Sequence, residues 1–242
     1  MSPPILTIEH FTKAYPGGKK AVDDLSLQVN PGDICGFIGH NGAGKTTTLR
    51  AVAGVLEFDE GEIAIDGHSV RSEPVPCKQM TAYLPDNPDL YEHLTGIQYL
   101  NFIADLFGVT APDREARIRD YGGRLELTAN LGDMISSYSH GMKQKLALIS
   151  AFVHAPRLLV LDEPFVGLDP QAAFRLKEMM HELCEQGGAI FFSTHVLEVA
   201  EKLCNRIAII RRGRLVACGP TEEIRGDSSL EEVFLEVVEH EK

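Results

Sequence analysis

The sequence predicts an α/β fold in which a buried, mostly parallel sheet carries a small antiparallel β subdomain and an inserted α-helical subdomain. Short, nearly continuous apolar runs, each followed by polar or Gly-rich residues and then a helical pattern, are typical of buried parallel strands. Elsewhere apolar and polar residues alternate, as in half-exposed strands, and one long central stretch shows only helical periodicity. With 242 residues, 44% of them hydrophobic, the chain can bury one sizeable core.

The expected strands fall into two groups. Four segments alternate apolar and polar residues between Pro, Gly and Asp turns, and they predict the small β layer: Leu6–Phe11, Leu25–Val29, Gly61–Asp66 and Arg206–Ile210. Three segments are nearly continuous apolar runs, and they predict the buried parallel sheet: Ile34–Ile38, Arg157–Leu161 and Ala189–Ser193.

Helical signals dominate between residues 87 and 154, where apolar residues such as Ile97, Leu100 and Ala104 recur at helical spacing. The last segment, 227–242, places Leu230 and Phe234 on one face and glutamates largely on the other, which predicts an amphipathic helix. We therefore expect a single domain over 1–242. Its α/β core and β subdomain occupy 1–86 and 155–226, its helical subdomain 87–154, and its C-terminal helix 227–242.

Composition narrows the partners. The net charge of −12 gives no general basic surface for phosphate backbones, so we expect no nucleic-acid partner. Five cysteines without a C-x-x-C pair or close histidines indicate neither a disulfide framework nor a zinc site. The N-terminal residues lack a basic segment followed by an apolar one, and no apolar stretch approaches the length of a bilayer span. We expect a cytoplasmic protein.

A glycine-rich loop directly after the strand Ile34–Ile38 fits the pattern G-x-x-x-x-G-K-[ST] at Gly39, Gly44, Lys45 and Thr46. Glycines let backbone N–H groups converge on phosphate oxygens, and the following helix presents its positive end. A lysine at this position reaches the β and γ phosphates, and the threonine hydroxyl can ligate Mg²⁺. The alternative is a chance match in a Gly-rich turn. The strand before the loop and the helix expected after it favour a P-loop NTPase (RecA-like) core that binds a nucleoside triphosphate.

An apolar strand ending in two adjacent carboxylates, Asp162 and Glu163, supplies the acidic groups that such a site needs. Asp162 is expected to face Mg²⁺ and Glu163 to polarise the attacking water. Side chains alternate along a strand, so the two carboxylates diverge and can serve different atoms of one reaction. Taken alone, an ordinary strand end with solvated acids would explain the pair equally well.

The ordered motifs resemble the nucleotide-binding domains of ABC transporters over nearly the whole chain. The segment Ser137–Lys145, about twenty residues before the carboxylate strand, resembles the LSGGQ signature. Gly167–Pro170 resembles the D-loop, and His195, after the strand Ala189–Ser193, resembles the switch histidine. The resemblance implies ATP and Mg²⁺ as cofactors and ATP hydrolysis as the activity.

The resemblance also assigns roles to individual residues. Glu163 and His195 are the expected catalytic residues; Asp169 is expected to connect the two sites of a dimer. Thr46, Asp162 and Asp86 are the expected Mg²⁺ contacts. The expected ATP-binding residues are Tyr15, Gly39, Asn41, Gly42, Ala43, Gly44, Lys45, Thr46, Thr47, Ser139 and Gly141.

Several of these residues also have a plainer interpretation. Ser139 is well suited to cap the following helix, and in the family that helix end grips the γ-phosphate bound by the opposite subunit. Asp169 can likewise be a helix cap. Tyr15 is expected to stack on adenine in the manner of the A-loop aromatic residue, and a surface tyrosine is the alternative.

Two departures from the family pattern stand out. Asp86 replaces the glutamine that usually ends the strand before the helical subdomain, and its shorter, charged side chain changes the expected metal contact. The signature carries His140 and Met142 where glycine and glutamine are usual. These variants, the segment Asn87–Thr95 and the ending Leu230–Leu235 resemble bacterial ABC-2-type exporter ATPases, including the EcsA-like group.

The resemblance implies an ATPase subunit that pairs with a second ATPase subunit, as a homodimer or a heterodimer, and drives separate transmembrane permease subunits. Such a subunit sits in the cytoplasm, peripherally on the inner face of the cell membrane. Two alternatives remain open from the sequence. One is a non-transport ABC ATPase acting on the ribosome or DNA. The other is a small-molecule kinase, which would leave Ser139, Asp169 and His195 without a common purpose.

Overall fold

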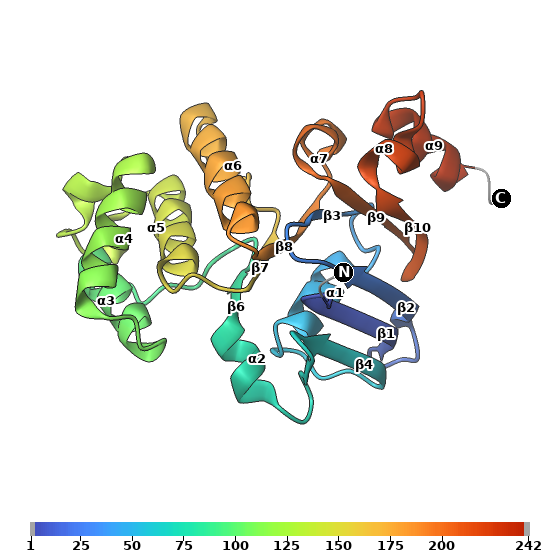
Figure 1. Ribbon diagram of the computed structural model, residues 1–242, viewed down its shortest axis with the longest axis horizontal. Coiled ribbons are helices and arrows are strands. Elements are labelled where there is room, and N and C mark those ends of the chain that lie inside the picture. Colours follow the sequence, from blue (N-terminus) through green and yellow to red (C-terminus); the bar gives the residue numbers. More distant parts are fainter. Residues whose placement is uncertain (1–2, 240–242) are drawn as a thin grey trace.

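The computed structural model describes residues 3–239. Within them, the larger of two sheets has six strands in the order β10-β9-β3-β8-β7-β6 (Figure 1). Its strands are β3 (Ile34–Ile38), β6 (Thr81–Leu84), β7 (Leu158–Asp162), β8 (Ala189–Thr194), β9 (Arg206–Arg211) and β10 (Arg214–Pro220). Neighbouring strands are parallel except β9 and β10, which are antiparallel. The predicted α/β fold with a mostly parallel buried sheet is therefore confirmed.

Strand β9 corrects one expectation. The segment Arg206–Ile210 was expected in the small β layer, but β9 lies in the large sheet and pairs in parallel with β3. The physical reason is that Ile207, Ala208, Ile209 and Ile210 are all buried, so both faces of the strand are covered. The apparent alternation came from the polar Arg206 at one end of a continuous apolar run.

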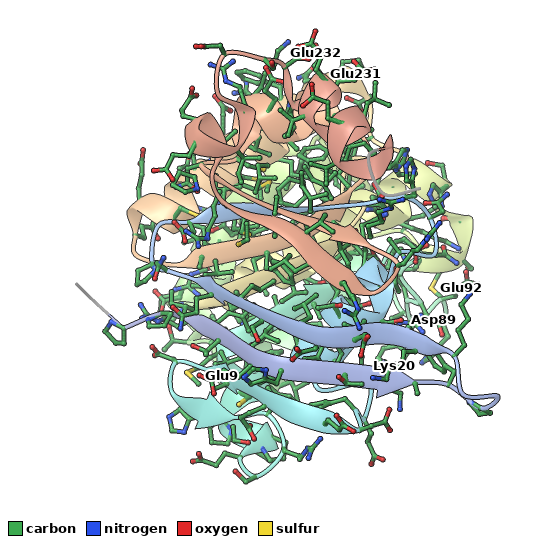
Figure 2. All side chains as sticks on the ribbon, turned by 90° about the vertical axis from the view of Figure 1, so that its right-hand side faces the viewer. Glu9, Lys20, Asp89, Glu92, Glu231 and Glu232 are labelled. Carbon is green, nitrogen blue, oxygen red and sulfur yellow. The ribbon has the colours of Figure 1, made fainter. Side chains whose placement is uncertain are left out.

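The smaller sheet is antiparallel, in the order β2-β1-β4-β5. Its strands are β1 (Leu6–Ala14), β2 (Lys20–Val29), β4 (Glu60–Ile65) and β5 (His68–Ser69). Apolar residues such as Leu6, Ile8 and Ile63 point into one core together with helix α1 (Lys45–Val52). The other face carries exposed polar residues such as Glu9, as expected for alternating strands (Figure 2).

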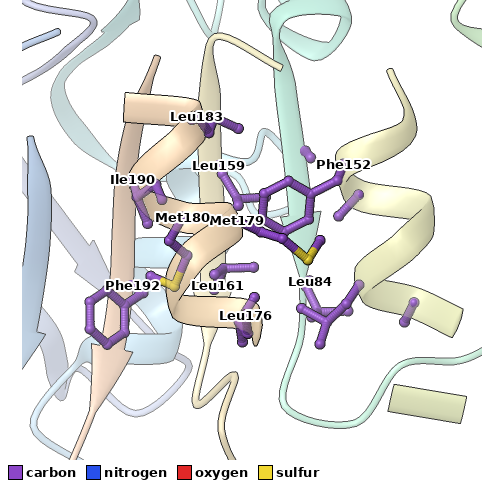
Figure 3. Packing of buried hydrophobic residues seen from close by; sticks show 14 of the residues in the cluster. Leu84, Phe152, Leu159, Leu161, Leu176, Met179, Met180, Leu183, Ile190 and Phe192 are labelled. Atoms are coloured by element: carbon purple, nitrogen blue, oxygen red, sulfur yellow. The ribbon is translucent and has the colours of Figure 1, made fainter. Parts of the chain in front are cut away.

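Successive residues of the large sheet supply two cores. Phe37, Val160 and Phe191 face α1 and the small sheet. Their neighbours Leu159 and Phe192 belong to a second core with α5 (His140–Val153) and α6 (Pro170–Glu185) (Figure 3). Burying each large apolar side chain contributes about 1.5–3 kcal/mol, so the sheet that carries the phosphate loop is held from both sides.

The central region consists of helices with well-defined starts. After α2 (Pro74–Met80) and β6 come α3 (Gly96–Leu106), α4 (Ala111–Arg124), two short 3₁₀ turns (Thr128–Asn130 and Ile135–Ser137) and α5. Thr95 caps α3 in a reciprocal box with Gln98, and Thr110 caps α4. Helices α3, α4 and α5 lie at the end of the molecule opposite the small sheet (Figure 1).

The remaining helices follow the strands of the large sheet: α7 (Leu197–Leu203), α8 (Thr221–Arg225) and α9 (Leu230–Glu239). Leu230 and Phe234 of α9 are buried, whereas Glu231 and Glu232 are exposed on its outer side (Figure 2). The expected C-terminal helix ran to residue 242, and residues 240–242 lie outside the described part of the chain. Within residues 3–239, no helix has the length and apolar character needed to cross a bilayer.

Candidate functional site

The phosphate loop fills the turn between β3 and α1, and two glycines there have no room for a side chain. A Cβ on Gly39 would lie 2.5 Å from the carbonyl oxygen of Ile210. Gly44 has φ 115° in the left-handed region, and its Cβ would lie 2.6 Å from the carbonyl oxygen of Ala21. The loop can therefore lie directly against neighbouring backbone only because both residues are glycine.

A two-residue turn between β9 and β10 fixes the loop from another side. The backbone N–H of Gly213 donates to the carbonyl oxygen of Ala43 over 2.9 Å. Arg212, the other turn residue, has φ 49°, a left-handed conformation that is uncommon for a residue with a side chain. This turn thus connects the edge of the large sheet to the middle of the loop.

Lys45 is the first residue of α1, and its side chain is only 7% exposed. Its Nζ donates to the carbonyl oxygens of Gly39 at 2.6 Å and His40 at 3.4 Å, and it lies 4.0 Å from Oε1 of Glu163. Burial lowers the pKa of Lys45, while the nearby Glu163 and Asp162 carboxylates act in the opposite direction. The ammonium group is therefore held inside the loop with little water, where an anion would interact with it strongly.

Asp162 ends strand β7 and is 1% exposed. The Ser193 hydroxyl of β8 donates to its Oδ1, whereas Oδ2 is buried and finds no hydrogen-bond partner among residues 3–239. A buried carboxylate oxygen without a partner is costly, commonly by about 1–3 kcal/mol or more. A cation bound at Oδ2 would remove that cost, so this residue fits a metal contact.

The backbone of Glu163 leaves the extended conformation of strand β7, so its side chain points in a different direction from that of Asp162. Its φ of 49° is left-handed, and its N–H donates to the carbonyl oxygen of Ser193 at 3.2 Å and to the Ser193 hydroxyl at 3.1 Å. Oε1 of Glu163 lies 2.9 Å from Nδ1 of His195, whose side chain is 57% exposed. Strained backbone of this kind, costing about 1–3 kcal/mol, concentrates at functional sites.

One pocket of about 1020 Å³ collects most of the predicted site. The predicted residues that line it are Tyr15, Asn41, Gly42, Gly44, Lys45, Thr46, Thr47, Asp86, Asp162 and Glu163. Gly39 and Ala43 are buried in the loop beneath it, and His195 contacts it through Glu163. The structure therefore brings the phosphate loop and the carboxylate pair to a single opening.

Tyr15 and Asp86 stand at the rim of this pocket. The Tyr15 side chain is half-exposed, and its hydroxyl lies 3.4 Å from Oγ1 of Thr47. Asp86 is exposed, and its Oδ1 accepts the backbone N–H of Asn87 over 2.9 Å. Both side chains are therefore accessible from the pocket opening, and neither is part of the hydrophobic core.

Ser139, Gly141 and Asp169 form a separate cluster that does not line this pocket within the described residues. The Ser139 hydroxyl accepts the backbone N–H of Met142 and caps α5. A Cβ on Gly141 would lie 3.1 Å from the carbonyl oxygen of Gly167, so the two segments touch. Asp169 caps α6 and pairs with Lys145 at 2.8 Å. The helix-cap interpretation of Ser139 and Asp169 describes the local geometry, and both cap residues are exposed.

Sequence reasoning missed several residues of the site. Ser193 forms hydrogen bonds with both the Asp162 carboxylate and the backbone N–H of Glu163. The sequence feature that could have identified it is a polar residue at the end of the apolar run Ala189–Ser193. Arg212 lines the pocket from a turn distant in sequence, and no local pattern marks it. The other pocket residues that were not predicted are Pro16, Lys19, Lys20, Ala21 and His40.

Comparison with known proteins gives a consistent result. Residues 22–166 match the sequence family described as ABC transporter. The ABC-type transporter ATP-binding protein EcsA of Bacillus subtilis (strain 168) is 32% identical over 242 residues, covering 98% of each chain. The solved ATP-binding subunit of an ABC transporter superposes with a TM-score of 0.94 at 33% identity, covering 97% of this chain and 100% of that one.

A further solved structure is the dimeric ATP-binding cassette MJ0796 in a post-hydrolysis state bound to ADP and Pi. It superposes with a TM-score of 0.80, covering 89% of this chain and 98% of that one. At 20% identity this likeness shows the fold alone.

The fold and the pocket define a nucleotide-hydrolysing domain of the P-loop class. The chain belongs to the ABC transporter family, as an ATP-binding and ATP-hydrolysing subunit. The predicted family and activity are thus confirmed, and similarity to EcsA supports the EcsA-like resemblance.

Proposed function

We propose that this chain hydrolyses ATP as one half of a dimer in which the α5 end of a second ATPase subunit closes each phosphate loop. Closure and release would drive separate transmembrane permease subunits. The observation that carries the proposal is the division of the site: phosphate loop and carboxylates share one pocket, while Ser139 stands at an exposed helix start elsewhere. A helix N-terminus with free N–H groups is suited to an anion presented from outside.

The chemistry is assigned to residues that already lie together. Lys45 would bind the β and γ phosphates once they replace the carbonyl contacts of its ammonium group. Glu163 would orient the attacking water and accept its proton, and His195, 2.9 Å away, would hold the carboxylate in place. Tyr15 would stack on the adenine ring, and Asp169 would contact the opposite subunit.

Mg²⁺ is the proposed second cofactor. Thr46 and Asp162 would hold it, as the unpaired Oδ2 of Asp162 favours, and Asp86 at the rim would contact it directly or through water. Bound there, the ion would neutralise part of the negative charge of the phosphates.

The transmembrane permease would contact the side of the molecule formed by the helical subdomain. We propose the division predicted above, with 87–154 as a subdomain that moves relative to the α/β core, and a permease contact that includes Asp86–Thr95. The similarity to EcsA supports the EcsA-like resemblance, and the ABC-2-type exporter that this resemblance implies is part of the proposal. With such a partner the chain would lie peripherally on the inner face of the membrane.

Sedimentation of the Glu163→Gln variant tests the proposal, because loss of the carboxylate should trap ATP in the closed state. We expect a monomer without nucleotide and a dimer with MgATP. Adding Ser139→Arg should abolish that dimer, since a large cation would occupy the phosphate-facing helix end. Ser72→Arg, on an exposed turn, is the matched control and should leave dimerisation unchanged.

A Glu163→Gln chain that binds MgATP and stays monomeric would overturn the homodimeric form of the proposal. Co-purification with a different ATPase subunit would then identify a heterodimer. Dimers that persist in the Ser139→Arg variant would show that the α5 end does not close the site.

A further inference from the structure

The C-terminal helix α9 touches the phosphate loop through a pair of rings. The Phe234 and His40 ring centroids lie 5.0 Å apart with an interplanar angle of 63°, an edge-to-face contact. Phe234 is 7% exposed, whereas His40 is an exposed residue that lines the nucleotide pocket. More than 190 residues of sequence separate the two, so only the tertiary fold brings them together.

Two hydrogen bonds connect helix α9 to the rest of the domain and thereby fix the position of Phe234. Leu230, at the start of the helix, is fully buried, and its N–H donates to Oε2 of Glu201 on α7 over 2.8 Å. Near the other end, Nη1 of Arg211 donates to the carbonyl oxygen of Val237 over 3.2 Å. The helix therefore bridges α7 and the end of β9 while its middle faces the loop.

His40 also takes part in hydrogen bonds within the phosphate loop. Its carbonyl oxygen accepts the backbone N–H of Ala43 at 3.1 Å and the ammonium of Lys45 at 3.4 Å. A shift of His40 would consequently disturb the curl of the loop and the position of the lysine that meets the phosphates. The ring contact is the link between that curl and a helix outside the pocket.

We propose that Phe234 is a positioning residue for the phosphate loop, which it holds in its ATP-binding conformation by packing on His40. This inference rests on the proposed nucleotide site and extends it to the C-terminal helix. Pre-organisation of this kind raises affinity because the loop loses less freedom when ATP binds. Once ATP is bound, its phosphates hold the loop themselves, so the turnover rate at saturation is affected less.

Binding of a fluorescent ribose-labelled ATP analogue, together with steady-state ATP hydrolysis, tests the proposal. For Phe234→Ala we expect the analogue's Kd and the KM for ATP to rise about threefold to tenfold, the range of a lost aromatic pair. The kcat should change by less than about twofold. Phe234→Leu, which keeps the helix packed without a ring, should give the same split with an unchanged midpoint of thermal unfolding. Phe234→Tyr should restore the wild-type Kd.

A double-mutant cycle locates the effect. His40→Ala and Phe234→Ala should be non-additive in Kd, because either change removes the same contact. Leu235→Ala, the exposed neighbour on α9, is the matched control and should behave like wild type. An unchanged Kd in both Phe234→Ala and Phe234→Leu, or additive effects in the cycle, would overturn the inference while leaving the proposed function intact. Failure of wild-type protein to bind the analogue would instead remove the nucleotide site itself.

Discussion

The buried Asp162 carboxylate of the nucleotide pocket and the exposed cap residues Ser139 and Asp169 differ in whether the chain itself satisfies their hydrogen-bonding groups. In the pocket, Lys45 and Asp162 are almost fully buried, and one oxygen of Asp162 has no partner among residues 3–239. At the start of α5, the exposed cap residue Ser139 accepts a hydrogen bond from its own helix, and the Asp169 carboxylate, 48% exposed, pairs with Lys145. Gln144 in the same helix differs, because its buried amide has no hydrogen-bond partner among residues 3–239. The Asp162 carboxylate is therefore incomplete without a ligand, whereas the two cap residues already have partners within the chain.

Replacing Lys45 with Met gives the largest expected effect on activity. Removing the cation from the phosphates should lower kcat/KM for ATP by about 10²–10³, as for other electrostatic contacts to a reacting group. The free energy of unfolding without nucleotide should not fall, because burial already disfavours this charge and lowers its pKa. ATPase assays and urea unfolding measure the two quantities. A chain that loses stability in parallel with activity would show that Lys45 is a structural residue.

Ser139→Arg tests the role of the exposed helix start outside the pocket. In the otherwise wild-type chain we expect hydrolysis to fall about 10²-fold, because the closed dimer is required for the catalytic geometry. Affinity of the monomer for the ATP analogue should stay within about twofold, since Ser139 does not line the pocket within the described residues. A strong loss of monomer affinity would contradict the division of the site into two half-sites.

His154 shows that, in the described part of the chain, a buried polar atom without a partner also occurs outside the nucleotide pocket. It stacks on Phe107 at 3.8 Å, and its Nδ1 is buried without a hydrogen-bond partner among residues 3–239. Burial, and to a smaller extent the charge of Arg117, lowers its pKa from 6.5 to about 4. In the unfolded chain His154 takes up its proton at higher pH, so stability is full above pH 6.5 and falls as the pH drops toward 4.

His154→Gln should remove that part of the pH dependence. Relative to wild type, the loss of unfolding free energy between pH 6.5 and pH 4 should shrink by on the order of 2–3 kcal/mol. Chemical unfolding at several pH values measures it. The matched control is His181→Gln, at an exposed position of α6. If the control flattens the curve as much as His154→Gln does, burial is not the cause.

The sequence could predict the parts of the fold that depend on local pattern. Continuous apolar runs at Ile34–Ile38 and Ala189–Ser193 identified parallel strands, because a strand buried on both faces leaves no polar period. The same rule, applied to Arg206–Ile210, would have placed β9 correctly, but its polar first residue suggested alternation. Strand order could not be predicted, since it depends on which buried faces meet.

The residues of the candidate site divide in the same way, into those marked by a local sequence motif and those brought together only by folding. Lys45 and Glu163 belong to contiguous motifs, which the sequence shows directly because the predicted chemistry needs such residues at fixed spacing, and both line the pocket. Arg212 and the Phe234–His40 contact were missed because each depends on chain segments that only folding brings together. Asp86 departs from the family pattern in the sequence, and it lies at the rim of the pocket in the structure.

The Lys145–Asp169 pair at the α5 end gives the smallest expected effect. The Asp169 carboxylate is 48% exposed, so solvent screens the pair, and Lys145→Met should lower the free energy of unfolding near pH 7 by about 0.5 kcal/mol. The hydrogen bond from Lys145 is the main cause that lowers the pKa of Asp169 below 3.8. The loss should therefore be present above pH 3.8 and disappear as the pH falls through the lowered value of the folded state. Lys202→Met, which breaks a pair with 71% and 77% exposed side chains, is the matched control and should have a smaller effect. A loss above about 2 kcal/mol for Lys145→Met would mean that the Lys145–Asp169 pair behaves as a buried ion pair. The contrast between this exposed cap and the buried Asp162 carboxylate would then fail.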